Sequence, residues 1–184
     1  MKENNLKIQE TFTLAVKKHQ ENELKAAVDL YEQILKVKPN HIDANYNLAK
    51  AFYELGKIKK AIIFYQKTLE INSSDADAHN NLGVIFQSLG EHEKAINCYR
   101  KAIQVNSNYI NAYNNLGAIL GEHKQLNAAK KNLEKSLSLD PNKAISCENY
   151  GNILLKLNQH KKGMGYIKKG TGFIKFSQKG FEII

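Results

Sequence analysis

Four asparagines recur at a constant interval of 34 residues, at positions 47, 81, 115 and 149. An Asn carboxamide carries an acceptor oxygen and donor hydrogens, so it can pair with the C=O and N–H groups of an extended chain whatever that chain's sequence. Each Asn precedes a large apolar or aromatic residue and then a small one. The chemistry that this series predicts is hydrogen bonding to a polypeptide.

Other reactive residues show no catalytic or metal-binding spacing. The six histidines form no His-Glu-x-x-His motif, and no Ser or Cys is paired with a recognisable base. Cys98 and Cys147 also lack the paired spacing of a zinc or redox site. We therefore expect no enzyme activity, no metal and no cofactor.

The asparagines belong to a repeat that organises almost the whole chain. We predict one domain over residues 8–177 and an apolar C-terminal tail over residues 178–184. The units are 8–41, 42–75, 76–109, 110–143 and a degenerate fifth at 144–177. A period of this length is typical of stacked helix-turn-helix units, which bury their apolar surfaces against their neighbours.

Apolar spacing within each unit predicts two helices. On the first helix, position seven is large and position eight is small, while position eleven is bulky in most units. The residues at position seven are Leu14, Leu48, Leu82, Leu116 and Tyr150. On the second helix, a small residue is followed four positions later by a large one. These pairs are Ala27 and Tyr31, Ala61 and Tyr65, Ala95 and Tyr99, Ala129 and Leu133, and Gly163 and Ile167.

This pattern resembles the tetratricopeptide repeat (TPR), whose signature places Leu-Gly, an aromatic residue, Ala, a second aromatic residue, Ala and Pro at fixed offsets. The segments at 113–117 and 95–102 are most similar to the repeats of O-linked N-acetylglucosamine transferases. The resemblance implies an all-α fold, a right-handed superhelical α-solenoid. It also implies a non-catalytic scaffold for protein interactions.

In such a stack, position six of each first helix lines the inner, concave wall. The resemblance therefore implies that Asn47, Asn81, Asn115 and Asn149 form an asparagine ladder that binds the backbone of an extended peptide. Neighbouring candidates are Asp43, Asp77 and Asn111 at position two, and Lys50 and Asn152 at position nine. Packed helices lie about 8 to 10 Å apart and an extended chain advances about 3.3 Å per residue, so each Asn would serve about three ligand residues.

Alternatives to the ladder stay open. Each Asn could instead bond a neighbouring repeat and be structural, or be inherited without a ligand. Asp43 and Asp77 could simply stabilise the first turn of a helix. A clamp for a C-terminal carboxylate, known in other arrays of this family, lacks its first Lys, because Tyr46 and Asn80 occupy position five.

The C-terminal region has its own features. Lysines and glycines are concentrated between residues 161 and 172, which suggests either a solvated basic helix or an anion site, although neither phosphate-binding fingerprint is present. The apolar residues that follow could fold over the end of the stack. They are Phe173, Ile174, Phe176, Phe181, Ile183 and Ile184. Docking of this tail, or of an exposed end of the stack, on a second copy is the alternative function, beside that of an accessory subunit of a separate enzyme.

The net charge of +9 lies mainly in this C-terminal region. Aromatic residues fall on core positions, so they do not interleave with basic residues along a groove, and a nucleic-acid partner is not expected. The sequence shows neither a signal peptide nor a membrane span. We expect a cytoplasmic protein without membrane contact.

Overall fold

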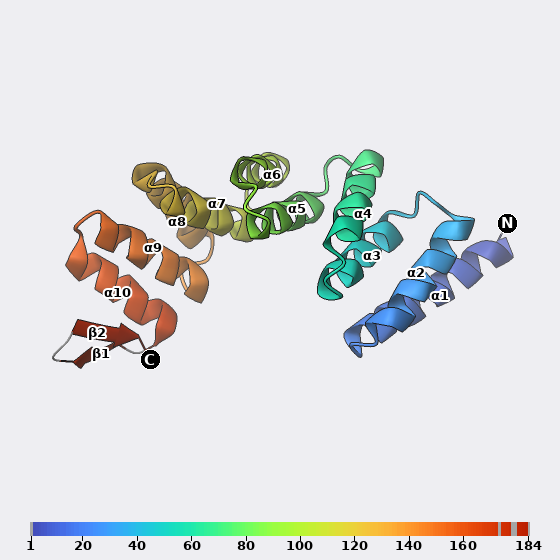
Figure 1. Cartoon of the computed structure of the whole chain (residues 1–184), viewed down its shortest axis with the longest axis horizontal. Coiled ribbons are helices and arrows are strands. Elements are labelled where there is room, and N and C mark those ends of the chain that lie inside the picture. Colours follow the sequence, from blue (N-terminus) through green and yellow to red (C-terminus); the bar gives the residue numbers. More distant parts are fainter. Residues whose placement is uncertain (1, 173, 178–179, 184) are drawn as a thin grey trace. The chain divides into compact units, whose positions relative to one another are not determined.

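The computed structural model describes residues 2–172, 174–177 and 180–183, and these residues form ten α-helices followed by two short β-strands (Figure 1). The helices are α1 (Lys2–Gln20), α2 (Leu24–Val37), α3 (Ile42–Glu54), α4 (Ile58–Ile71), α5 (Ala76–Ser88), α6 (His92–Val105), α7 (Ile110–Glu122), α8 (Leu126–Leu139), α9 (Ala144–Lys156) and α10 (His160–Thr171). Successive helices are joined by short turns into helix-turn-helix pairs. The prediction of an all-α array of paired helices is confirmed.

The chain divides into two compact units, Met1–Ile85 and Phe86–Ile184, with the division inside α5. In the first unit, α2 packs on both α1 and α3, and α3 packs on α4. In the second unit, α7 packs on α6 and α8, and α9 packs on α8 and α10. Helices thus contact mainly their neighbours in sequence, as the repeat pattern predicts.

The second helices bury the small and large positions that the spacing identified. All five small residues, from Ala27 to Gly163, are buried. The five large residues, from Tyr31 to Ile167, are at most 2% exposed. Aromatic and aliphatic side chains at one repeat position therefore supply the core of each pair.

Position seven of the first helices follows the prediction except in the first unit of the repeat. Leu48, Leu82, Leu116 and Tyr150 are buried, whereas Leu14 is 44% exposed. The prediction that Leu14 belongs to a buried stripe is wrong. The later first helices α3, α7 and α9 also pack on the second helix of the repeat before them. Among the described residues, no helix of a preceding repeat packs on α1, so Leu14 lacks this neighbour.

Glycines allow the last two helices to approach closely. A Cβ atom at Gly151 would lie 2.7 Å from the carbonyl oxygen of Gly163, and one at Gly163 would lie 2.9 Å from the carbonyl oxygen of Gly151. Both separations are too short for a side chain, so α9 and α10 pack backbone against backbone. This contact confirms the expected reason for small residues at these positions.

The turn inside every pair contains one residue with left-handed backbone geometry, always at position fifteen of the repeat. Its φ lies between 59° and 75°. The residues are Asn22, Gly56, Gly90, Lys124 and Asn158. Gly and Asn tolerate this conformation, whereas Lys does not favour it, so the turn at Lys124 is strained.

The second helix of the fifth repeat is slightly shorter than its counterparts, because it ends at position 28 of the repeat, whereas α2, α4, α6 and α8 end at position 30. Helix α10 ends at Thr171, where Gly172 adopts φ 84°, and an antiparallel hairpin of β1 (Ile174–Ser177) and β2 (Gly180–Ile183) follows. Ile174 pairs with Ile183 and Ser177 with Gly180. The predicted apolar cap rests on side chains from Phe173 onward, which lie outside the part of the structure described at side-chain level.

Candidate peptide-binding surface

In the first unit, α3 presents a polar face made by positions two, six, nine and thirteen of its repeat. These residues are Asp43, Asn47, Lys50 and Glu54. Their spacing of four, three and four residues places them on one side of the helix, opposite the buried Leu48 and Phe52. We call this surface, on each first helix, the first-helix face.

Asn81 on α5 uses both donor hydrogens in hydrogen bonds within the protein. Its Nδ2 donates to the hydroxyl of Tyr46 at 3.0 Å and to the hydroxyl of Tyr65 at 3.2 Å. Burial raises the pKa of both tyrosines, so each hydroxyl stays protonated. Asn81 therefore ties its own helix to the preceding repeat, which is the structural alternative to ligand binding.

The second unit repeats this bond with a different acceptor. Nδ2 of Asn149 donates to Oδ1 of Asn114 at 3.0 Å, and Nδ2 of Asn114 donates to Oδ1 of Asn115 at 3.4 Å. Asn114 is only 5% exposed. Asn149 and Asn115 are thus brought together through a buried amide at position five of the earlier repeat.

Asn47 differs from these asparagines. Its Nδ2 donates to the backbone carbonyl of Asp43 at 2.8 Å, four residues earlier on the same helix. Position five of the preceding repeat is Phe12, whose ring has no hydroxyl or amide to accept the bond. Asn47 consequently has no hydrogen bond to the described residues of the first repeat.

The flanking candidates lie at the surface. Asp43, Lys50 and Asp77 of the first unit are exposed, as are Asn111 and Asn152 of the second. Lys50 Nζ lies 3.9 Å from a carboxylate oxygen of Glu54. Asp43 and Asp77 both stand in the first turn of a helix, where an acidic residue is favourable without any ligand.

A cavity of about 220 Å³ opens beside Asn47, between the first-helix faces of α1 and α3. It is lined by Val16, His19, Gln20, Tyr31, Asn47, Lys50 and Glu54. His19 Nε2 lies 2.9 Å from Glu54 Oε2. The Tyr31 hydroxyl is buried without a hydrogen-bond partner, and burial, with a smaller effect of Glu54, raises its pKa to about 12.

Sequence reasoning identified Asn47 and Lys50 at this cavity but missed His19, Tyr31 and Glu54. Tyr31 stands at a core position, and its spacing gives no sign that its hydroxyl lacks a partner. The one available signal was Phe12, which replaces the polar residue found at position five in the next three repeats.

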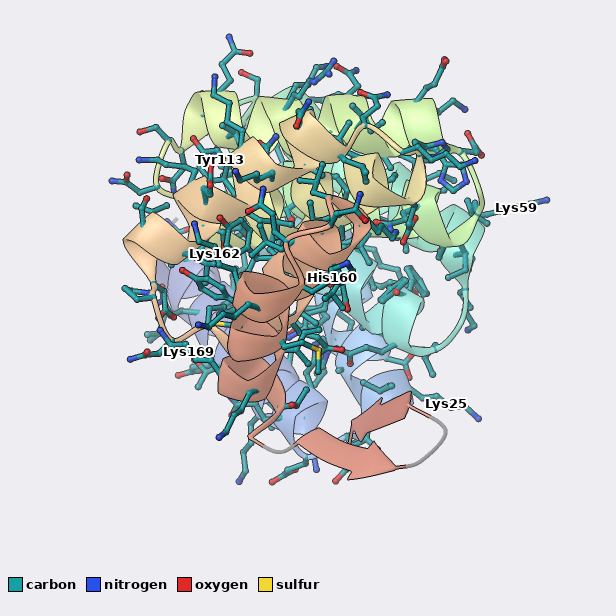
Figure 2. All side chains as sticks on the ribbon, turned by 90° about the vertical axis from the view of Figure 1, so that its left-hand side faces the viewer. Lys25, Lys59, Tyr113, His160, Lys162 and Lys169 are labelled. Atoms are coloured by element: carbon teal, nitrogen blue, oxygen red, sulfur yellow. The ribbon has the colours of Figure 1, made fainter. Side chains whose placement is uncertain are left out.

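The lysine and glycine segment forms α10 and not an open loop. Lys162 and Lys169 project from the same side of this helix into solvent (Figure 2). Gly163 and Gly170 face α9, where a Cβ at Gly170 would lie 2.6 Å from the carbonyl oxygen of Ala144. Gly163 and Gly170 therefore serve close packing, whereas a Cβ at Gly165 or Gly172 would have no atom within 4 Å.

Within the described ranges, no group of three or more His, Cys, Asp or Glu side chains is arranged to hold a metal ion. Among the described helices, none combines the length and the apolarity needed to cross a bilayer.

Fold and spacing together define a protein built from helix-turn-helix repeats, and comparison with protein families agrees. Models described as "Tetratricopeptide repeat" match residues 76–109 and 98–131, and a model described as "TPR repeat" matches residues 17–56 and 49–90. Together these matches span more than half of the 184 residues. The chain belongs to the tetratricopeptide repeat family, a class of protein-interaction modules.

Solved structures share this fold at low sequence identity. A MamA structure is 24% identical over 85% of this chain and 91% of its own, with a TM-score of 0.76. Pseudomonas aeruginosa PilF is 24% identical over 92% of this chain and 79% of its own, with a TM-score of 0.82. YrrB, described as "a TPR protein with an unusual peptide-binding site", is 20% identical over 88% of this chain and 84% of its own, with a TM-score of 0.71.

No curated protein sequence matches this chain. The resemblance to the repeats of O-linked N-acetylglucosamine transferases stays a prediction.

Proposed function

We propose that this protein is a non-catalytic scaffold that binds an extended polypeptide on its first-helix faces, with the position-six asparagines contacting the ligand backbone. The observation that carries the proposal is the orientation of Asn81 and Asn149. Each fixes its Nδ2 on the preceding repeat, and neither Oδ1 accepts a hydrogen bond from the described residues.

Anchoring of this kind favours binding. A carboxamide held by its nitrogen loses little side-chain freedom when its oxygen accepts a ligand N–H, so the entropic cost of the new bond is small. Asn81 and Asn149 therefore act chiefly as oriented acceptors in this proposal, because their donor hydrogens bond the preceding repeat. YrrB, which shares this fold and is described as having a peptide-binding site, is consistent with the proposal.

Residues beside the asparagines supply selectivity in this scheme. In the first unit, exposed Asp43 and Asp77 favour a basic ligand segment, and Lys50 can donate to a carbonyl or carboxylate. In the second unit, Asn111 and Asn152 add neutral donors and acceptors. Chemistry of this type selects a polypeptide by its backbone first and by a few side chains second.

Display selection of heptapeptides on the intact chain, followed by fluorescence anisotropy, tests the proposal. We expect Asn81→Ala and Asn149→Ala each to weaken the selected peptide about 5- to 10-fold, which corresponds to one hydrogen bond of about 1 to 1.4 kcal/mol. Asn97→Ala is the matched control, because Asn97 is an exposed asparagine on α6, the second helix of the third repeat, and not on a first-helix face.

Thermal melts must accompany these variants, because Asn81→Ala also removes a partner of Tyr46 and Tyr65. Unchanged affinity in the Asn81→Ala, Asn149→Ala double variant, at an intact fold, would show that the asparagines are purely structural.

Self-association is a second candidate, favoured by apolar surface on the first repeat. Leu14 is 44% and Val37 is 64% exposed. Val37, Ile8 and Ile34 line a groove of about 320 Å³ between α1 and α2. Counterparts of Leu14 in later repeats are buried, so a helix of a second copy has the right chemistry to cover this side.

A further inference from the structure

Two tyrosines of the first unit occupy the same repeat position but differ in hydrogen bonding. Tyr65 is 2% exposed, and its hydroxyl accepts a bond from Asn81 of the following repeat. Tyr31 is fully buried, and its hydroxyl has no partner among the described residues. A buried hydroxyl without a hydrogen-bond partner is unfavourable. Because Tyr31 lies beside a cavity, a ligand in that cavity could supply the missing partner.

The cause of the difference lies in two neighbouring residues. Asn47 is the counterpart of Asn81, but its Nδ2 is committed to the carbonyl of Asp43. Phe12 stands where Tyr46 stands one repeat later, so the polar cluster that satisfies Tyr65 cannot form around Tyr31. Tyr31 and Asn47 instead both line the cavity of about 220 Å³.

Charges at the cavity favour a neutral ligand group. Lys50 Nζ and Glu54 Oε1 are 3.9 Å apart, which is longer than a hydrogen bond. His19 occupies the other carboxylate oxygen, Oε2. An anionic ligand would gain from Lys50 but be repelled by Glu54, and the reverse holds for a cationic ligand.

We propose that this cavity is a subsite for a primary carboxamide, the side chain of a Gln or Asn in a bound peptide. The Tyr31 hydroxyl has almost no accessible surface in the free protein, so the side chains over it must shift as the ligand enters. The amide carbonyl then accepts from the Tyr31 hydroxyl and from Lys50, and the amide nitrogen donates to Glu54 Oε1 and Asn47 Oδ1. This inference rests on the proposed function, because the cavity opens on the first-helix face, and it adds a specific preference to backbone binding.

Four peptides test the subsite on the intact, ¹⁵N-labelled chain. Each is an acetylated alanine heptapeptide with an N-methylamide end and Gln, Glu, Lys or Leu at its centre, so that only the Gln peptide carries a primary carboxamide. We expect the Gln peptide to shift the amide resonances around Tyr31 and Lys50, and to bind at least about 5-fold more tightly than the other three, as one added hydrogen bond would give.

Variants then assign the preference to named groups. Tyr31→Phe and Lys50→Ala should remove the preference for Gln, while the matched variant Tyr65→Phe should retain it. An independent readout is thermal stability of the free protein. Tyr31→Phe should not lower the melting temperature, since it removes an unpartnered hydroxyl, whereas Tyr65→Phe should lower it.

Each contrary outcome has a definite meaning. Equal affinity for the four peptides, or a Gln preference that persists in Tyr31→Phe, overturns the subsite and leaves the proposed function standing. Failure of all four peptides to bind, together with unchanged affinity of Asn81→Ala for display-selected peptides, overturns both.

Discussion

At the scale of single residues, identical asparagines at identical repeat positions have different roles. Asn81 and Asn149 bond the preceding repeat because position five there is Tyr46 or Asn114, which can accept. Asn47 faces Phe12 and turns to its own helix. The role of a periodic residue is thus decided by its partner, which lies about one repeat away.

His41 is a residue whose protonation should affect stability. Its Nδ1 accepts from the backbone N–H of Ala44 at 3.3 Å and caps α3, and its ring stacks on Phe12 at 5.4 Å. Burial lowers the pKa of His41 below its usual 6.5, against an opposing effect of Asp43. As pH falls, the imidazole of His41 is protonated in the unfolded chain before it is protonated in the folded protein. The contribution of His41 to the free energy of unfolding is therefore complete above pH 6.5 and is lost as pH falls through the lowered pKa.

We therefore expect the free energy of unfolding to fall more steeply between about pH 7.5 and 5 in the wild type than in His41→Asn, whose cap does not titrate. Urea unfolding of both proteins at several pH values measures this difference. Groups other than His41 titrate in both proteins, so their effects cancel when the two pH profiles are subtracted. Parallel pH profiles for the two proteins would show that the His41 cap does not depend on its protonation.

At the scale of elements, every repeat turns with a left-handed residue at position fifteen. Lys124 has φ 59°, although Lys disfavours this region, and Gly90 has φ 75° at the equivalent position. We expect Lys124→Gly to raise the free energy of unfolding by up to about 1 kcal/mol, because it relieves backbone strain.

Gly90→Ala is the matched reverse change. No atom lies within 4 Å of the Cβ position at Gly90, so only the backbone conformation penalises the substitution, and we expect a loss of about 1 kcal/mol. Chemical denaturation measures both variants. A Lys124→Gly protein no more stable than the wild type would mean that the Lys124 turn is unstrained.

Helix positions were predictable at this scale because they depend on local spacing. Small and large residues four apart predicted the buried sides of α2, α4, α6, α8 and α10, and all ten residues are buried. The end of α10 was not predictable from the same pattern. The lysine and glycine motif continues in helical register, yet Gly172 adopts φ 84° and a β-hairpin follows.

At the scale of the whole molecule, a repeat array is held together by neighbour contacts, so an uncovered repeat surface is available to another copy. We expect the weight-average sedimentation coefficient to rise with concentration, and Val37→Glu to abolish the rise by placing a charge in the groove beside Ile8 and Ile34.

Ile63→Glu provides the control for this experiment, since Ile63 is 58% exposed on α4 and does not line the groove. It should leave association unchanged. A protein that sediments as a monomer at every concentration would exclude self-association through the first repeat.

The sequence by itself determined the number of repeats, their helical register and the candidate status of Asn47, Asn81, Asn115 and Asn149. These features follow from spacing along one chain, because apolar burial on a helix repeats every three to four residues. Only the tertiary structure decided that Asn81 bonds Tyr46 and Tyr65, and that Tyr31 is left unpartnered beside a cavity. Hydrogen bonds form between groups about 3 Å apart in space, and those groups come from helices separated by a whole repeat.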